Sequence, residues 1–200
     1  MIPRRRLLKL AVASPLVISA ATQVACGFIQ RGSEDISFTQ FGTLLTFNHE
    51  QANTLFAFSE ACLALEPGEI IDANVIARLD EEFYFVSSFI RSDFKLALNV
   101  MEYLPIVYGS FSRFSKLSTI QREDLLDKFS HTKSDTVRAV VHNLRMAVML
   151  TFYGHESSWS AIKYDGSFSN IPAQQSTQRK HYQERTTAAT QAHQHEGRKV

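Results

Sequence analysis

Histidine beside an acidic residue is the pattern in this chain that comes nearest to acid–base or metal chemistry. His49-Glu50 and His155-Glu156 are such pairs, and His142 falls within a run with helical spacing. Adjacent residues point in different directions on a helix, and a metal site needs further ligands at a fixed spacing. Neither pair therefore predicts a metal or acid–base site, and His142 is expected to be a satisfied interior or boundary histidine.

The sequence also lacks the motifs of the common catalytic and cofactor sites. It contains no Gly-x-Ser-x-Gly elbow, phosphate-binding glycine loop, His-Glu-x-x-His helix or dinucleotide fingerprint. Its two cysteines, Cys26 and Cys62, form neither a haem-attachment motif nor an iron–sulfur spacing. We predict no catalytic, cofactor-binding or metal-binding residue in this chain.

The first residues instead have the pattern of an export signal. An arginine cluster is followed by an apolar stretch without acidic residues up to Ala25. The order resembles a twin-arginine signal, in which an arginine pair precedes any residue, two large apolar residues and often lysine. The residues that match are Arg4, Arg5, Leu7, Leu8 and Lys9. Residues 1–26 are therefore predicted to direct the chain to the periplasm by the twin-arginine route.

Two alternatives to this signal remain, a transmembrane anchor and an ordinary secretory signal. A span needs about 20 apolar residues, and Pro15 and several polar residues interrupt this stretch, so a cleaved signal is favoured over an anchor. Cys26 is a candidate lipid-attachment site, although Gln23 stands where a lipoprotein signal normally has leucine.

Length and charge indicate one acidic domain between the signal and a polar tail. Of the 21 Lys and Arg residues, four lie in the signal and five after Ile171, which leaves 12 between Gly27 and Asn170 against 18 acidic residues. This net charge of −6 argues against nucleic-acid binding, which needs a basic surface. Residues 27–170 are long enough to form one core.

Helical signals account for nearly all of this domain. Capping boxes at Asn48 and Ser118 predict two helix starts, and Cys62 is expected in the core behind the first. A long run from Val75 to Met101 has helical spacing, with Asp72 as its cap, Pro105 as its end and Ser92-Asp93 as a candidate start of a second helix. A further helix is predicted to start at Ser134 or Asp135 and to end at Gly154. It has an inner face of Val137, Val141, Leu144, Val148 and Phe152. The prediction is an all-α bundle of four to five helices.

The tail from 171 to 200 has a different composition, rich in Gln, Thr, Arg and His. Such a segment buries too little apolar surface to offset its ordering entropy, so it is predicted to be disordered. Its histidines, His181, His193 and His195, lack further ligands at a fixed spacing and are predicted to be solvated.

Large side chains after Gly154 are the clearest candidate for a binding surface. Trp159, Ile162 and Tyr164 follow the predicted helix end and precede a turn signal at Asp165-Gly166. Tryptophan and tyrosine in such positions are typical anchors of protein interfaces. A strap laid over the bundle's own core is the alternative, and the sequence does not decide between the two.

The closing part of the domain resembles a known family. The segment Phe152-Tyr153-Gly154-His155, followed by Trp159-Ser160-Ala161-Ile162-Lys163-Tyr164-Asp165-Gly166, is similar to the end of the small subunit family typified by gluconate 2-dehydrogenase subunit 3. The twin-arginine-like signal and the helical pattern agree with that family up to Asn170. The departures are His155-Glu156 and Ser167, because the family often has proline near these positions.

The resemblance implies a non-catalytic subunit. Such subunits accompany a large FAD-dependent dehydrogenase of the glucose–methanol–choline type, often with a multihaem cytochrome c, and carry the flavoprotein through export. By this resemblance, the partner interface is Trp159, Ile162, Tyr164, Asp165 and Gly166, FAD belongs to the partner, and the complex associates with the inner membrane from the periplasm. The alternative is a free-standing periplasmic helical lipoprotein or ligand-binding module, and an independent enzyme is the third hypothesis.

Overall fold

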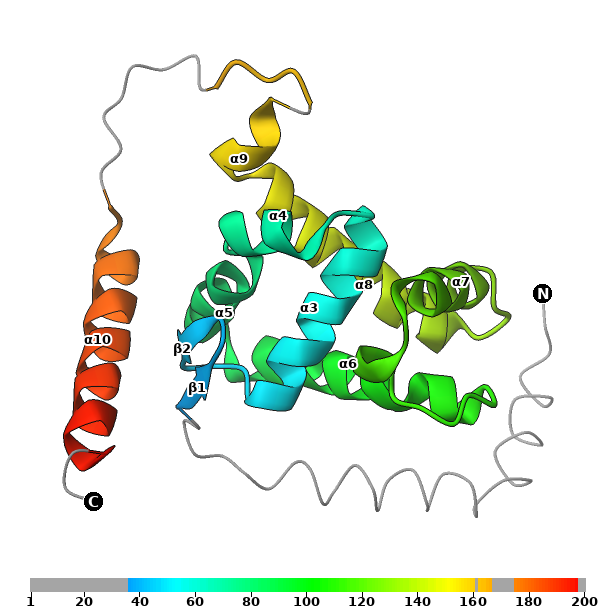
Figure 1. The fold of residues 1–200 in the computed structure, drawn as a ribbon, viewed down its shortest axis with the longest axis horizontal. Helices are drawn as coiled ribbons and strands as arrows, with labels where there is room; N and C mark the ends of the chain where they lie inside the picture. Colours follow the sequence, from blue (N-terminus) through cyan, green and yellow to red (C-terminus); the bar gives the residue numbers. More distant parts are fainter. Residues whose placement is uncertain (1–35, 161, 167–174, 198–200) are drawn as a thin grey trace, which may run out of the picture. The chain divides into compact units, whose positions relative to one another are not determined.

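The computed structural model describes residues 36–160, 162–166 and 175–197. Within these ranges the chain is almost entirely helical, which confirms the predicted all-α class. The central helix is α3 (His49–Leu63), which contacts α5 (Val75–Phe85), α6 (Ser88–Val107), α7 (Thr119–Ser130) and α8 (Asp135–Tyr153). Figure 1 shows α3 and α8 crossing between the other helices.

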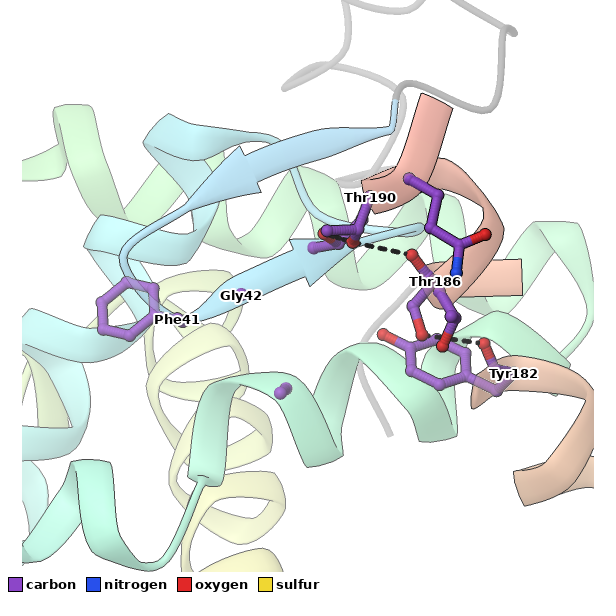
Figure 2. Close-up of a pocket in the computed structure, with 9 residues that line it drawn as sticks. Phe41, Gly42, Tyr182, Thr186 and Thr190 are labelled. Carbon is purple, nitrogen blue, oxygen red and sulfur yellow. Dashed lines mark hydrogen bonds between the residues drawn. The ribbon is translucent and has the colours of Figure 1, made fainter. Parts of the chain in front are cut away.

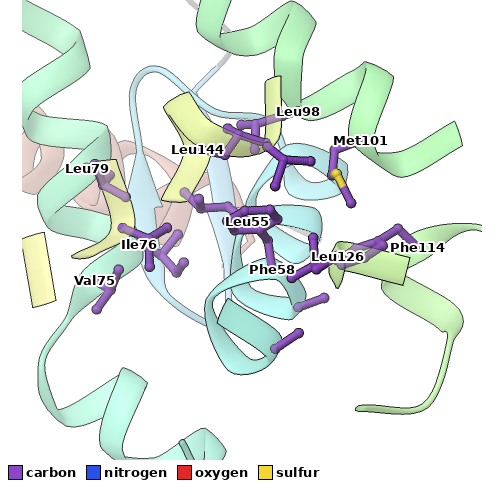
Figure 3. Close-up of a cluster of buried hydrophobic side chains, with 14 of the residues drawn as sticks. Leu55, Phe58, Val75, Ile76, Leu79, Leu98, Met101, Phe114, Leu126 and Leu144 are labelled. Carbon is purple, nitrogen blue, oxygen red and sulfur yellow. The ribbon is translucent and has the colours of Figure 1, made fainter. Parts of the chain in front are cut away.

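The core lies where these helices meet (Figure 3). Leu55 and Phe58 from α3, Leu98 and Met101 from α6, and Leu144 from α8 are all fully buried. Burying a large apolar side chain contributes about 1.5–3 kcal/mol, so this cluster is the main stabilising feature of the bundle. Phe114 of the short 3-10 helix η1 (Phe114–Lys116) adds a ring that lies near Phe58.

Two helix starts form as their local sequences predict. The Asn48 side chain accepts a hydrogen bond from the Gln51 backbone amide at 2.9 Å, and the Gln51 side-chain oxygen accepts one from the Asn48 backbone amide at 3.2 Å. Ser118 and Gln121 form the same reciprocal pair at the start of α7. A capping box satisfies two amides that have no partner within the helix, so both ends are fixed locally.

The long run from Val75 to Met101 forms two helices rather than one. The break falls at Val86 and Ser87, and the Ser87 hydroxyl accepts from the Ile90 amide at 3.4 Å as the cap of α6. The predicted second start at Ser92-Asp93 is therefore wrong by about one turn. Asp72 is not the cap of α5: it ends the short helix α4 (Pro67–Asp72), and Asn74 precedes α5 in a left-handed conformation. Pro105 lies in the last turn of α6, two residues before its end.

The inner face of α8 is confirmed in full. All five predicted residues are buried, Ser134 caps the helix start, and Gly154 follows its last residue. Cys62 packs against the core as a partly buried free thiol. Its burial raises the thiol pKa, and the charge and hydrogen bond of Arg145 lower it by less.

A short hairpin precedes α3 and was not predicted. Strands β1 (Ser37–Thr39) and β2 (Gly42–Leu44) pair antiparallel, with Phe38 opposite Thr43. Three residues per strand give no measurable alternation, so the sequence carries no clear strand signal here. A turn at Gln40 and Phe41 joins the strands, and Gly42 has a positive φ of 101°.

The prediction of disorder is wrong for most of the tail, where α10 (Thr177–Gly197) forms. This helix is polar on nearly every side, and Tyr182 is its one buried residue. It contacts α5 and β2. Together with α4, the short helix α9 (Glu156–Trp159) and the division of the long run, α10 brings the described residues above the predicted four to five helices.

Candidate partner-binding surface

The predicted interface residues lie together in a turn segment, residues 155–166, directly after α8. The first part of the segment is α9, which is capped by His155: its Nδ1 accepts from the Ser157 backbone amide at 3.3 Å. Ser158 is buried and its hydroxyl donates to the His155 carbonyl at 2.8 Å. His155 therefore has a structural role as the cap of α9.

A compact turn follows α9 and brings the two large rings together. The Tyr164 amide donates to the Trp159 carbonyl at 2.9 Å, which closes the turn. The rings of Trp159 and Tyr164 meet edge to face, with centroids 5.1 Å apart. This arrangement is favourable for aromatic pairs and holds both rings in one orientation.

Gly166 has a specific reason to be glycine. Its φ is +100°, a conformation that side-chain-bearing residues rarely adopt, and an added Cβ would lie 3.3 Å from the Trp159 ring. Lys163 also has a positive φ, so the turn contains two left-handed residues within four positions. The local sequence thus shapes the turn around the indole.

The turn segment displays its apolar side chains instead of burying them. Ile162 is 48% exposed, Tyr164 is 41% exposed, and Trp159 is half-buried. Asp165 is exposed beside them. Among the described residues, none between 155 and 166 belongs to the hydrophobic core cluster.

An adjoining apolar face on α8 was missed by the sequence analysis. Its members are exposed and spaced by three or four residues, and they are Met146, Met149, Leu150 and Tyr153. We call these four residues the α8 outer face. Leu150 is 69% exposed, against 0% for Leu144 on the inner face. The α8 outer face was visible in the sequence as a second apolar stripe with helical period, beside the stripe that faces the core.

The buried carboxylates of the described residues all have structural partners. Glu102 accepts from the hydroxyls of Thr54 at 3.0 Å and Ser115 at 2.6 Å, and so joins α3, α6 and η1. Glu60 on α3 pairs with Arg122 on α7 at 2.6 Å, with both side chains largely buried. These groups hold elements together.

The third buried carboxylate, Asp80 on α5, binds the chain just before α3. Its carboxylate accepts hydrogen bonds from the backbone amides of Leu45, Thr46 and Phe47 at 2.7–2.9 Å. It accepts a further hydrogen bond from the Tyr182 hydroxyl at 2.6 Å. Desolvation raises the pKa of Asp80, and these hydrogen bonds lower it by less. Asp80 was not among the residues predicted from the sequence to carry a function.

The other histidines are dispersed. His49 and His142 are exposed, on α3 and α8. The His131 ring interacts with the carbonyl of Asp127 one turn earlier on α7. His193 stacks on Phe38 at 4.0 Å, and His181 lies near Tyr84 and Phe85, so these two tail histidines contact the bundle. Within the described ranges, no group of three or more His, Cys, Asp or Glu residues is placed to hold a metal ion.

The predicted export signal lies outside the described residues. This applies to Arg4, Arg5, Leu7, Leu8 and Lys9, and also to Cys26, the candidate lipidation site. In the part of the chain that is described, no helix combines the length and the apolar character required to cross a membrane.

Comparison with known proteins gives no relative. No family model, curated protein or solved structure matches the chain.

Proposed function

We propose that this chain is a non-catalytic small subunit that escorts a FAD-dependent dehydrogenase of the glucose–methanol–choline type through export and supports it in the periplasm. The observation that carries the proposal is the exposed aromatic turn segment beside the α8 outer face. Both are held in fixed shape by their own hydrogen bonds and packing, as a binding surface requires.

The chemistry of this surface suits burial against another folded protein. Trp159, Ile162 and Tyr164 supply one half, and the α8 outer face supplies the other with two methionines, a leucine and a tyrosine. Aromatic and methionine side chains are enriched in interface cores, and a few large anchors carry most of the binding energy. Glu156 and Asp165, near the two ends of the turn segment, are exposed charges, as in a polar rim.

In this proposal the reactive groups belong to the partner. FAD is bound by the large subunit, which removes a hydride from a sugar or alcohol, and a multihaem cytochrome c subunit is a further partner that accepts the electrons. The present chain contributes the docking surface and, through Arg4 and Arg5, the address read by the export machinery. The proposal rests on the resemblance of residues 152–166 and on the geometry of the described surface.

The central test is purification of the tagged chain from its native host under mild conditions. We expect a flavoprotein to co-purify and to be identified by its flavin absorbance and by mass spectrometry. Trp159→Ala and Leu150→Ala should each reduce the recovered flavoprotein by about tenfold or more, as expected for interface anchors. Ile120→Ala is the matched control, because Ile120 is 77% exposed on α7, which carries none of the proposed interface residues.

The melting temperature of each variant separates an interface from a core role. If Trp159→Ala lowers the melting temperature as much as it lowers flavoprotein recovery, the indole stabilises the bundle itself and the proposed interface is wrong. If wild-type protein purifies alone, the proposal fails. A diacylglycerol on Cys26 in that case would favour the alternative of a free-standing periplasmic lipoprotein.

A second test concerns the escort role. Deleting residues 2–25 should leave the dehydrogenase in the cytoplasm, because the partner is proposed to have no signal of its own. Lysine in place of both Arg4 and Arg5 provides the finer variant, since it keeps the positive charge but removes the arginine pair. Dehydrogenase activity that still reaches the periplasm in these strains would rule out the escort role.

A further inference from the structure

The polar helix α10 is bound to the bundle by a few directional contacts. The strongest is the hydrogen bond from the Tyr182 hydroxyl to Asp80, at 2.6 Å, with both side chains buried. Arg179 pairs with Glu81 at 2.9 Å, one turn before Tyr182. Farther along, the hydroxyls of Thr190 and Thr43 are 2.7 Å apart. These contacts lie at intervals along one side of the helix.

Apolar packing contributes little to this docking. Tyr182 is the one buried residue of α10, which is otherwise formed of polar residues, three alanines and the final glycine. An open hollow of about 360 Å³ remains beside the helix, lined by Phe41, Thr43, Ala77, Tyr182, Thr186 and Thr190. Figure 2 shows Tyr182, Thr186 and Thr190 on the side of α10 that faces β2 and Gly42. The contact is therefore specific but loosely packed.

The bundle's own core does not depend on α10. The core cluster is formed by residues from 44 to 152 and includes no residue of α10. Undocking α10 would expose one buried tyrosine, separate the rings of α10 from those of Phe38, Tyr84 and Phe85, and break a few polar contacts. Regions with few buried apolar contacts open locally at much lower free energy than the core.

From this geometry we infer that the surface formed by β2 and α5 is a helix-docking groove that α10 of this same chain occupies reversibly. The helix detaches as a unit while the bundle stays folded. The groove recognises its occupant by a buried carboxylate, Asp80, that accepts a tyrosine hydroxyl, and by an acidic side chain, Glu81, that pairs with an arginine three positions earlier on the helix. The occupied groove is closed to other helices, and detachment of α10 opens it.

Hydrogen exchange of the full-length chain tests the detachment. All variants carry Cys26→Ser, and exchange is followed by mass spectrometry of peptic peptides. We expect α10 amides to exchange at least about tenfold faster than those of α3 and α8, as a local opening requires. Tyr182→Phe should accelerate exchange in α10 by a further tenfold or so, the contribution of one hydrogen bond to a charged group, while α3 and α8 still exchange more slowly than α10. Tyr153→Phe, on the exposed α8 outer face, is the matched control and should change nothing in α10.

An engineered disulfide between α10 and β2 tests the same docking by strengthening it, where Tyr182→Phe weakens it. Thr43→Cys with Thr190→Cys places two sulfurs where hydroxyl oxygens are now 2.7 Å apart, close enough for a disulfide. Oxidation should slow exchange in α10 to that of the bundle, and reduction should restore it.

Binding of a peptide in trans tests the groove. A fluorescent peptide of residues 175–197 should bind the full-length Tyr182→Phe chain, whose own helix is weakened. The peptide carrying Tyr182→Phe should bind it about tenfold more weakly or worse. The oxidised Thr43→Cys/Thr190→Cys chain should not bind the peptide.

Two results would overturn the inference. One is exchange of the α10 amides no faster than that of the α3 and α8 amides when Tyr182 is present, since that would show global rather than local opening. The other is absence of peptide binding to the Tyr182→Phe chain up to about 1 mM, a concentration that reveals even weak complexes.

Discussion

Asp80→Asn is the substitution that tests most directly how the bundle is held together. In the native chain Oδ1 accepts the amides of Thr46 and Phe47, and Oδ2 accepts the Leu45 amide and the Tyr182 hydroxyl. Asparagine keeps one acceptor oxygen and replaces the other with an NH₂ group. When the asparagine oxygen takes the Oδ1 position, its NH₂ group takes the Oδ2 position. The Leu45 amide then faces another donor and loses its hydrogen-bond partner. The Tyr182 hydroxyl can rotate and accept a hydrogen bond from the NH₂ group.

The size of the effect follows from these contacts. One buried amide without a partner costs about 1–3 kcal/mol, and bonds to a neutral acceptor are weaker than bonds to a carboxylate by about 1 kcal/mol each. Removing a buried charge offsets part of this loss, because its desolvation is no longer required. We expect the free energy of unfolding to fall by about 2–4 kcal/mol, a large part of the 5–15 kcal/mol typical of a domain.

Urea unfolding followed by far-ultraviolet circular dichroism gives this value for the full-length protein. Asp93→Asn is the matched control, because Asp93 is exposed on α6, and it should change the stability by no more than about 0.5 kcal/mol. The double variant with Tyr182→Phe should lose less than the sum of the single losses, since the two side chains share a bond. A loss below about 1 kcal/mol for Asp80→Asn, or full additivity, would show that the carboxylate does not act as described.

Three further predictions use the remaining features. Leu144→Ala should cost about 2–5 kcal/mol in urea unfolding because the side chain is fully buried, whereas Leu150→Ala on the same helix should cost no more than about 0.5 kcal/mol, and equal losses would contradict the division of α8 into two faces. Gly166→Ala should distort the turn around Trp159, visible as a changed tryptophan emission spectrum with an unchanged melting temperature; an unchanged spectrum would show that the turn does not need glycine. Burial and the charge of Asp80 raise the pKa of Tyr182, so its contribution to stability is complete below the ordinary pKa near 10 and is lost as pH rises above it, by about 1.4 kcal/mol per unit. Tyr182→Phe should lack this alkaline loss when unfolding is compared across pH, and parallel curves would contradict the assignment.

The sequence predicted those parts of the structure that depend on neighbours along the chain. The capping boxes of Asn48 and Ser118 and the buried face of α8 each involve residues within one or a few turns of a helix, so their signals are local. The cap of α6 was missed because several serines in that run satisfy the same rule. The choice of Ser87 depends on how α5 and α6 pack against α8.

The candidate site was predicted in part for the same reason. Trp159, Ile162 and Tyr164 were predicted as interface residues because large side chains beside turn signals are visible in any sequence. The structure added their exposure and the edge-to-face contact of Trp159 and Tyr164. The α8 outer face had the right period, but a sequence pattern alone does not show which of two apolar stripes faces the core.

By itself, the sequence determined the helical class, the ends of three helices and the inner face of α8, because each depends on short-range hydrogen bonding and on a period of 3.6 residues. Only the tertiary structure determines that the polar tail forms a helix that packs on the bundle. Its helix is held by a bond between Tyr182 and Asp80, which lie 102 positions apart. Neither the composition of the tail nor that of α5 contains this information, because the bond exists only once the hairpin, α5 and α10 have been brought to the same place.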